Sequence, residues 1–217
     1  NSGDVTDDKS RVVGYSSVVF YGGAPQASVE GIATLSKEQK SKLIQIVRSA
    51  VEEIVRTGKT FKVTESDPRL QEEEGAFVTI HRRGQLRGCI GHIIGDQPLY
   101  LTVRDMAIAA ATQDPRFPAM SKEELENMEV EVSVLSKPRV IKDVNEIVMG
   151  VHGVIIGRGA QRGLFLPQVA TDTGWSRDEF LSELCEQKAG LPRDCWKDPK
   201  THIEIFTANV FSEQDIL

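Results

Sequence analysis

Residues 76–92 read Ala-Phe-Val-Thr-Ile-His-Arg-Arg-Gly-Gln-Leu-Arg-Gly-Cys-Ile-Gly-His, and the expected fold class follows from this stretch. Residues 76–81 are apolar and β-prone, residues 82–85 can turn and residues 86–90 can return, so the pattern predicts a β-hairpin. A hairpin makes its two strands antiparallel neighbours. The sequence therefore favours a sheet with short links over a regular βαβ rhythm.

Helical patterns lie on both sides of the hairpin. Ser36 is followed three residues later by Gln39, a capping-box pattern that predicts the start of a helix. Apolar residues then recur at helical spacing until Thr57-Gly58, where the helix should end. Residues 99–112 suit a second helix, which should end before Pro115 because the residue before a proline avoids the α region.

The second half of the chain continues to mix helices and strands. Capping boxes of the form Ser-x-x-Glu predict a short helical turn after Ser121 and a helix after Ser176. Residues 128–134 alternate between apolar and polar side chains, the period of a half-buried strand. Further strands are predicted at residues 154–156, 164–166 and 202–211. The fold class that these elements predict is α+β, an antiparallel or mixed sheet with flanking helices.

Residues 1–22 differ from the rest of the chain. Residues 12–20 predict a single strand, and residues 22–25 (Gly-Gly-Ala-Pro) punctuate the chain as a linker does. A lone strand needs a partner for its backbone groups. We therefore place a boundary near residue 23, with residues 23–34 as a linker and residues 35–217 as a domain.

Composition bounds the function. The 217 residues include 26 basic and 32 acidic side chains, which gives a formal charge of −6 and argues against wholesale nucleic-acid binding. The apolar content of 40% suits a globular protein rather than a disordered one. No apolar run approaches a membrane span, and no signal peptide is visible. Three scattered cysteines do not suggest a disulfide scaffold, so the expected location is a reducing compartment, the cytoplasm.

Cys89 lies in the most unusual part of the hairpin, flanked by Gly88 and Gly91 and two residues after Arg87. In a regular strand Arg87 and Cys89 point to one face, about 6–7 Å apart. A cation at that distance favours the thiolate, which predicts a nucleophilic Cys89 with a lowered pKa. Gly88 and Gly91 would let a ligand come close. The alternative is a small buried cysteine, with glycines that allow only a bulge or a helix contact.

The register of the hairpin decides whether His81 lies near the thiol. A three-residue loop places Thr79 opposite Cys89, and His81 then lies opposite Arg87. A loop of two or four residues places Val78 opposite Cys89 instead, because one step of register exchanges the two faces. The sequence leaves both registers open.

A metal site is not supported. Cys89-x-x-His92 has a plausible ligand spacing, and His92 could reach Cys89 if Gly91 breaks the strand. No second ligand pair lies nearby, however, whereas structural zinc needs four ligands. Three cysteines also cannot supply a four-cysteine iron–sulfur cluster. We expect no metal and no cofactor in this chain.

Two groups of charged residues are further candidates. Residues 81–83 (His-Arg-Arg) with Arg87 form one local basic patch, and Arg158 with Arg162 can form a second. Arginines can grip phosphate or carboxylate in bidentate fashion, although solvated loop tips explain them equally. The nearby glycines do not match a nucleotide-binding motif.

Two carboxylates are candidates as well. Asp114 follows the second helix, where it could pair with Arg116 or with a backbone amide. Glu131 lies among apolar strand residues and could face solvent or a cleft. We expect both carboxylates at solvent, unless the fold brings an acid beside Cys89 and Arg87.

The hairpin also carries a family resemblance. Residues 86–91 (Leu-Arg-Gly-Cys-Ile-Gly) resemble the signature of the AMMECR domain family, component A of the AmmeMemoRadiSam system. Other separated motifs that fit this family lie at residues 114–117, 131–136, 165–169 and 175–196. Residues 1–20 resemble the C-terminal end of the Memo family, component B of that system. The chain thus resembles an AMMECR domain over about residues 35–212, preceded by a Memo-like tail at residues 1–22.

The resemblance implies an α+β fold in two unequal lobes, with a cleft near the signature, and it supplies no reaction. It implies as partners a Memo-family domain fused upstream and a radical-SAM protein. Our first hypothesis is a component of a modification pathway that uses Cys89 as nucleophile or carrier thiol. In that hypothesis the substrate contacts come from the six other candidate site residues: Arg87, Gly88, Gly91, His81, His92 and Glu131. The second is a non-enzymatic docking module for the same partners, so whether the chain is an enzyme stays open.

Overall fold

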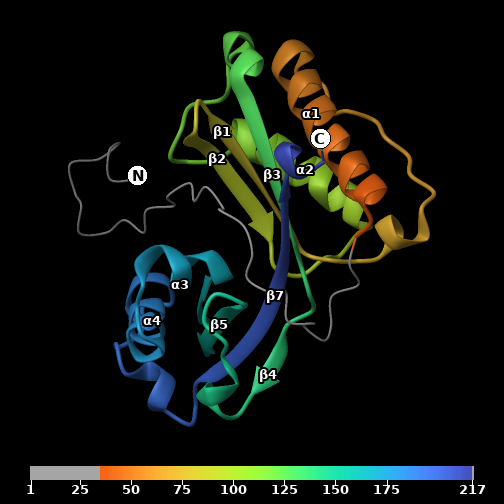
Figure 1. Cartoon of the computed structure of the whole chain (residues 1–217). Coiled ribbons are helices and arrows are strands. Elements are labelled where there is room, and N and C mark those ends of the chain that lie inside the picture. Colours follow the sequence, from red (N-terminus) through yellow and green to blue (C-terminus); the bar gives the residue numbers. More distant parts are fainter. Residues whose placement is uncertain (1–34, 217) are drawn as a thin grey trace. The chain divides into compact units, whose positions relative to one another are not determined.

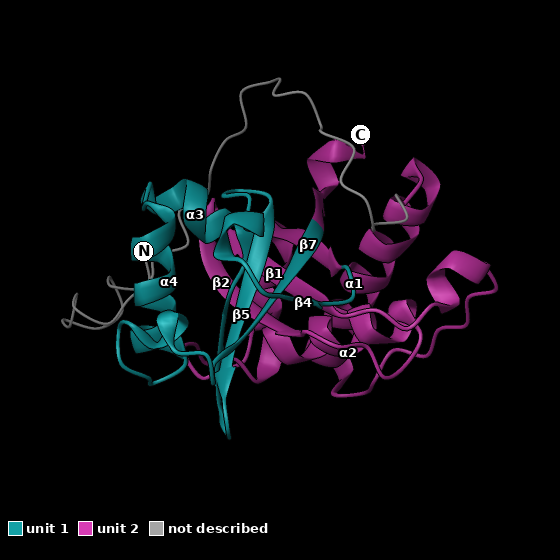
Figure 2. Ribbon diagram, turned by 90° about the horizontal axis from the view of Figure 1, so that it is seen from below, with its two compact units in different colours: residues 1–31, 136–208 teal, residues 32–135, 209–217 magenta. Residues whose placement is uncertain are grey.

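The computed structural model describes residues 35–216, which fall into two compact units. Of the described residues, unit 1 comprises 136–208 and unit 2 comprises 35–135 with 209–216 (Figure 2). The expected strand at residues 12–20, the boundary near residue 23 and the Memo-like tail lie outside the described residues. The α+β class that the sequence predicts is confirmed, because antiparallel strands and helices mix in both units.

Unit 2 combines helices with a three-stranded antiparallel sheet (Figure 1). Its helices are α1 (Lys37–Thr57) and α2 (Leu99–Thr112), with short 3-10 helices η3 (Pro68–Gln71), η4 (Lys122–Asn127) and η8 (Glu213–Asp215). Its strands are β1 (Ala76–Arg82), β2 (Gln85–His92) and β3 (Met128–Leu135), in the order β2-β1-β3. Strand β2 is therefore an edge strand within these three.

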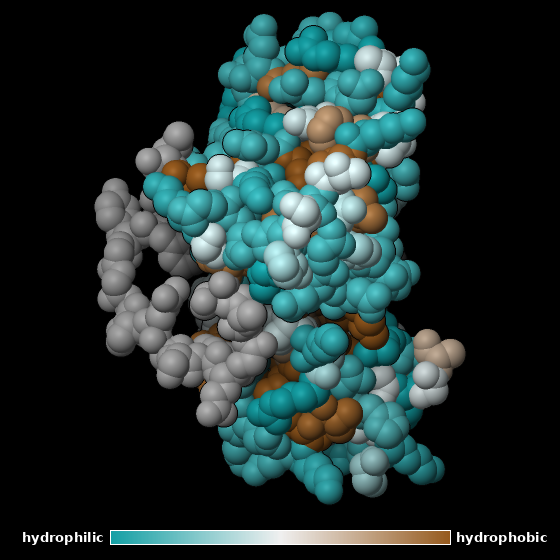
Figure 3. Space-filling model, turned by 90° about the vertical axis from the view of Figure 1, so that its right-hand side faces the viewer, coloured by the Kyte–Doolittle hydropathy of each residue, from teal (hydrophilic) through white to brown (hydrophobic). Residues whose placement is uncertain are grey.

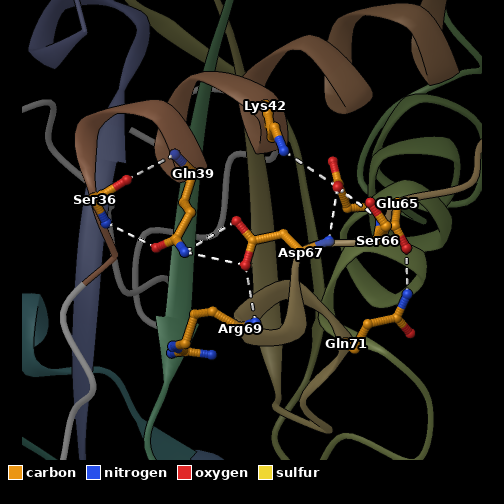
Figure 4. A network of polar contacts seen from close by, with 8 residues as sticks. All are labelled: Ser36, Gln39, Lys42, Glu65, Ser66, Asp67, Arg69 and Gln71. Carbon is orange, nitrogen blue, oxygen red and sulfur yellow. Dashed lines mark hydrogen bonds and ion pairs between the residues drawn. The ribbon is translucent and has the colours of Figure 1, made fainter.

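Helix α1 begins where its capping box predicts. The Ser36 side chain accepts a hydrogen bond from the backbone of Gln39, and the Gln39 side chain accepts one from the backbone of Ser36. The Gln39 amide also donates to the Asp67 carboxylate, so it ties the start of α1 to the loop before η3 (Figure 4). Gly58 ends the helix in the left-handed conformation that favours glycine.

The helices of unit 2 cover one face of its sheet. Val78 and Ile80 of β1 are fully buried and belong to the same core as Val47 of α1 and Val103 of α2. Because side chains alternate along a strand, Phe77, Thr79 and His81 point to the opposite face. The sheet thus has one face that supports the helices and one face that carries the polar side chains.

Unit 1 is built on a separate apolar core. Its strands are β4 (Arg139–Ile141), β5 (His152–Arg158), β6 (Gln161–Phe165) and the first part of β7 (His202–Ser212). Its helices are α3 (Pro167–Thr173) and α4 (Arg177–Glu183), with η5 (Val144–Glu146), the π-helical turn η6 (Leu184–Lys188) and η7 (Cys195–Lys197). Strand β7 pairs antiparallel with β4 on one side and with β5 on the other.

Two of the three cysteines form a disulfide, which corrects the expectation from cysteine usage. Cys185 and Cys195 are bonded, with their Cα atoms 6.0 Å apart, and both are buried in the core of unit 1. They lie ten residues apart, so the pair has no CxxC spacing that would have predicted the bond. The argument from unpaired cysteines to a reducing compartment therefore does not hold.

The surface of the described residues is mainly polar. Figure 3 shows one face, on which hydrophilic residues predominate and apolar ones form scattered patches. Only Ile94, Val140 and Val148 are large apolar residues with high exposure among residues 35–216. None of the described helices is long and apolar enough to cross a membrane.

Candidate functional site around Cys89

A β-bulge at Arg87 sets the direction of every side chain in the signature. Near the turn His81 pairs with Leu86, but the next pair is Ile80 with Gly88, so Arg87 has no partner on β1. The hairpin therefore begins in the register of a two-residue loop and changes at Arg87 to the register that the three-residue loop predicted. The extra residue places Thr79 opposite Cys89.

Cys89, Thr79 and Glu131 form one row across the polar face of the sheet. Thr79 of β1 lies opposite Cys89 of β2 and opposite Glu131 of β3. The Thr79 hydroxyl donates a hydrogen bond to Cys89 Sγ over 3.3 Å. Cys89 is half-buried as a residue, and its thiol is the only free thiol of the chain. We call these three residues the cysteine row.

Arg87 does not act on the thiol, and the expectation that it shares a face with Cys89 is wrong. Its guanidinium is bidentate on Glu124, at 2.7 and 3.1 Å, and donates to the Pro118 carbonyl over 2.9 Å. It also lies over the Phe117 ring, 5.6 Å from the centroid. The physical reason is the bulge, which breaks the alternation that a regular strand would impose.

The glycines of the signature are filled by protein atoms. A Cβ on Gly88 would lie 2.1 Å from the Ala110 carbonyl oxygen, so α2 packs directly on the strand backbone. A Cβ on Gly91 would meet the Phe77 ring at 2.2 Å. Both positions therefore need glycine for close packing. This geometry favours the helix-contact alternative over the admission of a ligand at these two residues.

Asp114 and Arg116 hold the backbone of Cys89 from the outer edge of β2. The Asp114 Oδ2 atom accepts a hydrogen bond from the Cys89 amide over 2.8 Å, and Arg116 Nη2 donates to the Cys89 carbonyl over 3.4 Å. Arg116 and Asp114 also form an ion pair at 2.7 Å. Asp114 is only 4% exposed, which corrects the expectation of a solvent position. The sequence showed the possible partners of Asp114 but not their proximity to Cys89.

The pKa shifts in the cysteine row follow from burial and from these charges. Burial raises the pKa of the Cys89 thiol, and the hydrogen bond from Thr79 and the charge of Arg116 only partly oppose it. The resting thiol therefore keeps its proton at neutral pH, contrary to the lowered pKa that the sequence predicted. Burial also raises the pKa of Glu131, with help from the charge of Asp215. A raised pKa makes a carboxylate a better proton acceptor.

The two histidines of the hairpin take different positions. His81 lies on the polar face opposite Leu86 and Glu129, and burial lowers its pKa so that the imidazole is neutral. Its place two residues from Thr79 puts it next to the cysteine row. His92 is exposed at the end of β2, and the strand continues through Gly91, so the condition for a contact between His92 and Cys89 is not met.

The two basic patches are largely neutralised. Arg82 and Arg87 both reach Glu124, at 3.6 and 2.7 Å. In unit 1, Arg158 and Arg162 each pair with an acid, at 2.8 and 2.9 Å: Asp198 and Glu204 respectively. Within residues 35–216 no group of three or more His, Cys, Asp or Glu side chains could hold a metal ion.

These features define an α+β protein with an antiparallel sheet whose polar face carries one clamped thiol. A family model described as AMMECR1 matches residues 44–211. The chain belongs to the AMMECR1 family, as its signature suggested.

Similar proteins are known from archaea. A protein of Methanothermobacter thermautotrophicus is 43% identical over 188 residues, which cover 83% of this chain and 97% of that protein. A protein of Pyrococcus furiosus is 43% identical over 183 residues, with 79% of this chain and 87% of that protein covered. The crystal structure of an uncharacterized protein from Pyrococcus horikoshii superimposes with a TM-score of 0.74 at 42% identity, covering 79% of this chain and 90% of that one. The crystal structure supports the fold.

Proposed function

We propose that this chain is a component of a radical-SAM-linked modification pathway in which Cys89 serves as nucleophile or carrier thiol. The observation that carries the proposal is the cysteine row, where the chain's only free thiol belongs to a half-buried residue and is hydrogen-bonded to Thr79 at 3.3 Å. Its backbone is fixed on the other edge by Asp114 and Arg116. A nucleophile held in this way loses little freedom on reaction.

Because the pKa of Cys89 is raised, its thiol needs a base before it can act as a nucleophile. Because the thiol keeps its proton, attack on an electrophilic carbon needs a base that accepts this proton as the sulfur–carbon bond forms. Glu131 suits the role, since it lies in the same row and its pKa is raised. His81 is a second acceptor on the same face, with a neutral imidazole. In the free chain at neutral pH the thiol thus stays protonated, and it reacts with a substrate once such a base accepts its proton.

Mass spectrometry of peptides from the chain isolated from host cells tests this function. We expect a substrate-derived mass increase on the Cys89 peptide, absent from Cys89→Ser. The peptides with Cys185 and Cys195 are internal references, because both sulfurs are bonded. If the Cys89→Ser chain shows the same mass increase as the unsubstituted chain, the proposal is contradicted.

A docking module is the second candidate, and the packing of the signature favours it. Gly88, Gly91 and Arg87 are all occupied by protein contacts, so the signature can serve to build a surface rather than to hold a substrate. The partners would be the Memo-family domain and the radical-SAM protein that the resemblance implies. Arg83, exposed at the tip of the hairpin, is the charge on this surface that can be changed without breaking a buried pair.

Partner capture separates the two candidates. A docking module predicts that Arg83→Glu weakens capture of the purified radical-SAM partner, whereas Cys89→Ser leaves it intact. The thiol function predicts that Cys89→Ser abolishes the mass increase, whereas Arg83→Glu leaves it intact. Equal capture by the unsubstituted chain and Arg83→Glu would contradict docking through this hairpin.

A further inference from the structure

We infer that Asp114 and Arg116 are the positioning residues of Cys89, and that Arg116 is the cation that promotes loss of its proton. This inference rests on the proposed function for its biological use. It assigns to Arg116 the role that the sequence gave to Arg87, and to Asp114 the task of holding Arg116 in place.

Asp114 and Arg116 lie on the outer edge of β2, beside the backbone of Cys89. Cys89 and Thr79 are opposite each other, while the amide and carbonyl of Cys89 bond to Asp114 and Arg116. Both backbone groups of Cys89 therefore point away from β1, the arrangement of a non-hydrogen-bonded pair in which side chains lie closest. The side-chain pair takes the place that a neighbouring strand would occupy, and so it fixes the residue that carries the sulfur.

Several hydrogen bonds converge on Asp114. Its Oδ1 atom accepts from the amide and the Nε of Arg116, both at 3.0 Å, and its Oδ2 atom accepts from Arg116 Nη2 and the Cys89 amide. Burial acts to raise the pKa of this carboxyl, but the hydrogen bonds from Arg116 and Cys89 outweigh it and the pKa is lowered. A carboxylate with this many donors is a rigid anchor for the guanidinium.

Charges of both signs act on the sulfur. From β3, Glu131 opposes a thiolate, and so does Asp114 from the loop after α2. Arg116, itself paired with Asp114, is the cation whose charge favours the thiolate, while Arg87 is bonded to Glu124. On β1, Thr79 belongs to the row and neutral His81 lies two residues from it. Two further acids act on residues of this face: Glu129 lies opposite His81, and Asp215 of η8 raises the pKa of Glu131.

The test is an alkaline titration of Cys89 in the full chain. The thiolate is read from its ultraviolet absorbance against Cys89→Ser and from the rate of alkylation by iodoacetamide, with the disulfide intact. Arg116→Gln should move the midpoint to higher pH and slow alkylation about threefold to tenfold at a mildly alkaline pH, because a favourable charge is lost. Glu131→Gln should move the midpoint to lower pH. Arg116→Lys, which keeps the charge, should recover much of the loss.

The controls separate a charge effect from a loss of structure. Arg162→Gln makes the same change in unit 1, in an exposed pair with Glu204, and should leave the titration unchanged. If Arg116→Gln loses its circular dichroism, Arg116→Met replaces it, because methionine keeps a side-chain stem beside Phe117. An unchanged or lower midpoint in the folded variant would overturn the inference. Since this titration needs no partner, its failure leaves the mass test of Cys89 standing, and the reverse also holds.

Discussion

Gly88 has no side chain because the carbonyl oxygen of Ala110 lies where its Cβ would be. The sequence showed that glycines flank Cys89, and it offered close packing and ligand access as rival explanations. The structure favours packing at Gly88 and Gly91. At the scale of single residues, the identity of a glycine is visible in a sequence but the atom that demands it is not.

The first prediction concerns that contact. Gly88→Ala should lower the free energy of unfolding of unit 2 by about 1–3 kcal/mol, because α2 or β2 must shift to admit the methyl group. Gly157→Ala in β5 is the matched control, since its Cβ would lie at an ordinary 3.6 Å from its neighbours. Urea unfolding measures both variants, and equal stability of the two would disprove the packing role of Gly88.

The second prediction concerns the ion pair of Arg87. Glu124→Gln should destabilise unit 2 by about 3 kcal/mol, because it leaves a buried guanidinium without its counter-ion. Glu204→Gln, which breaks the more exposed pair with Arg162, should cost less than about 1 kcal/mol.

The pH dependence of the Glu124→Gln effect follows from the sign of the shift at Glu124. The hydrogen bond from Arg87 lowers the pKa of Glu124 despite burial. The stabilisation is therefore present above the pKa of an unfolded glutamate and is lost as the pH falls through the folded pKa. Urea midpoints of the unsubstituted chain and Glu124→Gln should converge in acid, and a constant gap would contradict the assignment.

At the scale of elements, helices whose signals lie within a few residues in the sequence were predictable. The capping boxes at Ser36, Ser121 and Ser176 are all formed, and α2 spans the residues that its pattern predicts. Strand β4 escaped prediction because three residues are too few to show an alternation. Helix α3 escaped it because its N-cap, Leu166, makes no side-chain hydrogen bond.

The third prediction tests such a local signal. Ser36→Ala should cost about 1 kcal/mol of stability, because the orphan amide of Gln39 loses its acceptor. Ser41→Ala, inside the same helix, should be neutral or slightly stabilising, since alanine is the better helix former. Thermal unfolding followed by circular dichroism compares them. A larger loss in Ser41→Ala than in Ser36→Ala would exclude the capping role.

At the scale of the whole molecule, contacts between distant residues escaped the sequence. The pairing of β1 with β3, the Cys185–Cys195 bond and the place of Asp114 beside Cys89 all join residues at least ten positions apart. The class of the fold was still predictable, because the mixture of capped helices and short antiparallel strands is a local property. The candidate site was predictable as far as Cys89 and Glu131, and not as far as Arg116.

The fourth prediction uses the division into two units. Reduction of the disulfide should lower the stability of unit 1 by about 3 kcal/mol, because a short loop is released in the unfolded chain. Both tryptophans of the chain, Trp175 and Trp196, lie in unit 1, so their fluorescence reports its unfolding. The alkylation rate of Cys89 reports the structure of unit 2, and reduction of the disulfide should leave this rate unchanged. Reduction that leaves the fluorescence transition unchanged would show that the bond adds no stability.

Because Arg87 is an extra residue on β2, the face to which the Cys89 sulfur points depends on the number of residues between the turn and Cys89. Deleting Arg87 would remove the bulge and continue the register of the turn, in which Thr79 still lies opposite Cys89, whereas deleting one residue more would place Ile80 opposite Cys89 and turn the sulfur toward the helices. Losses of one residue should accordingly be commoner in this segment than losses of two wherever the thiol is needed. An excess of one-residue over two-residue losses among natural variants would indicate that selection maintains the orientation of the sulfur. Equal numbers would indicate that selection maintains only the strand.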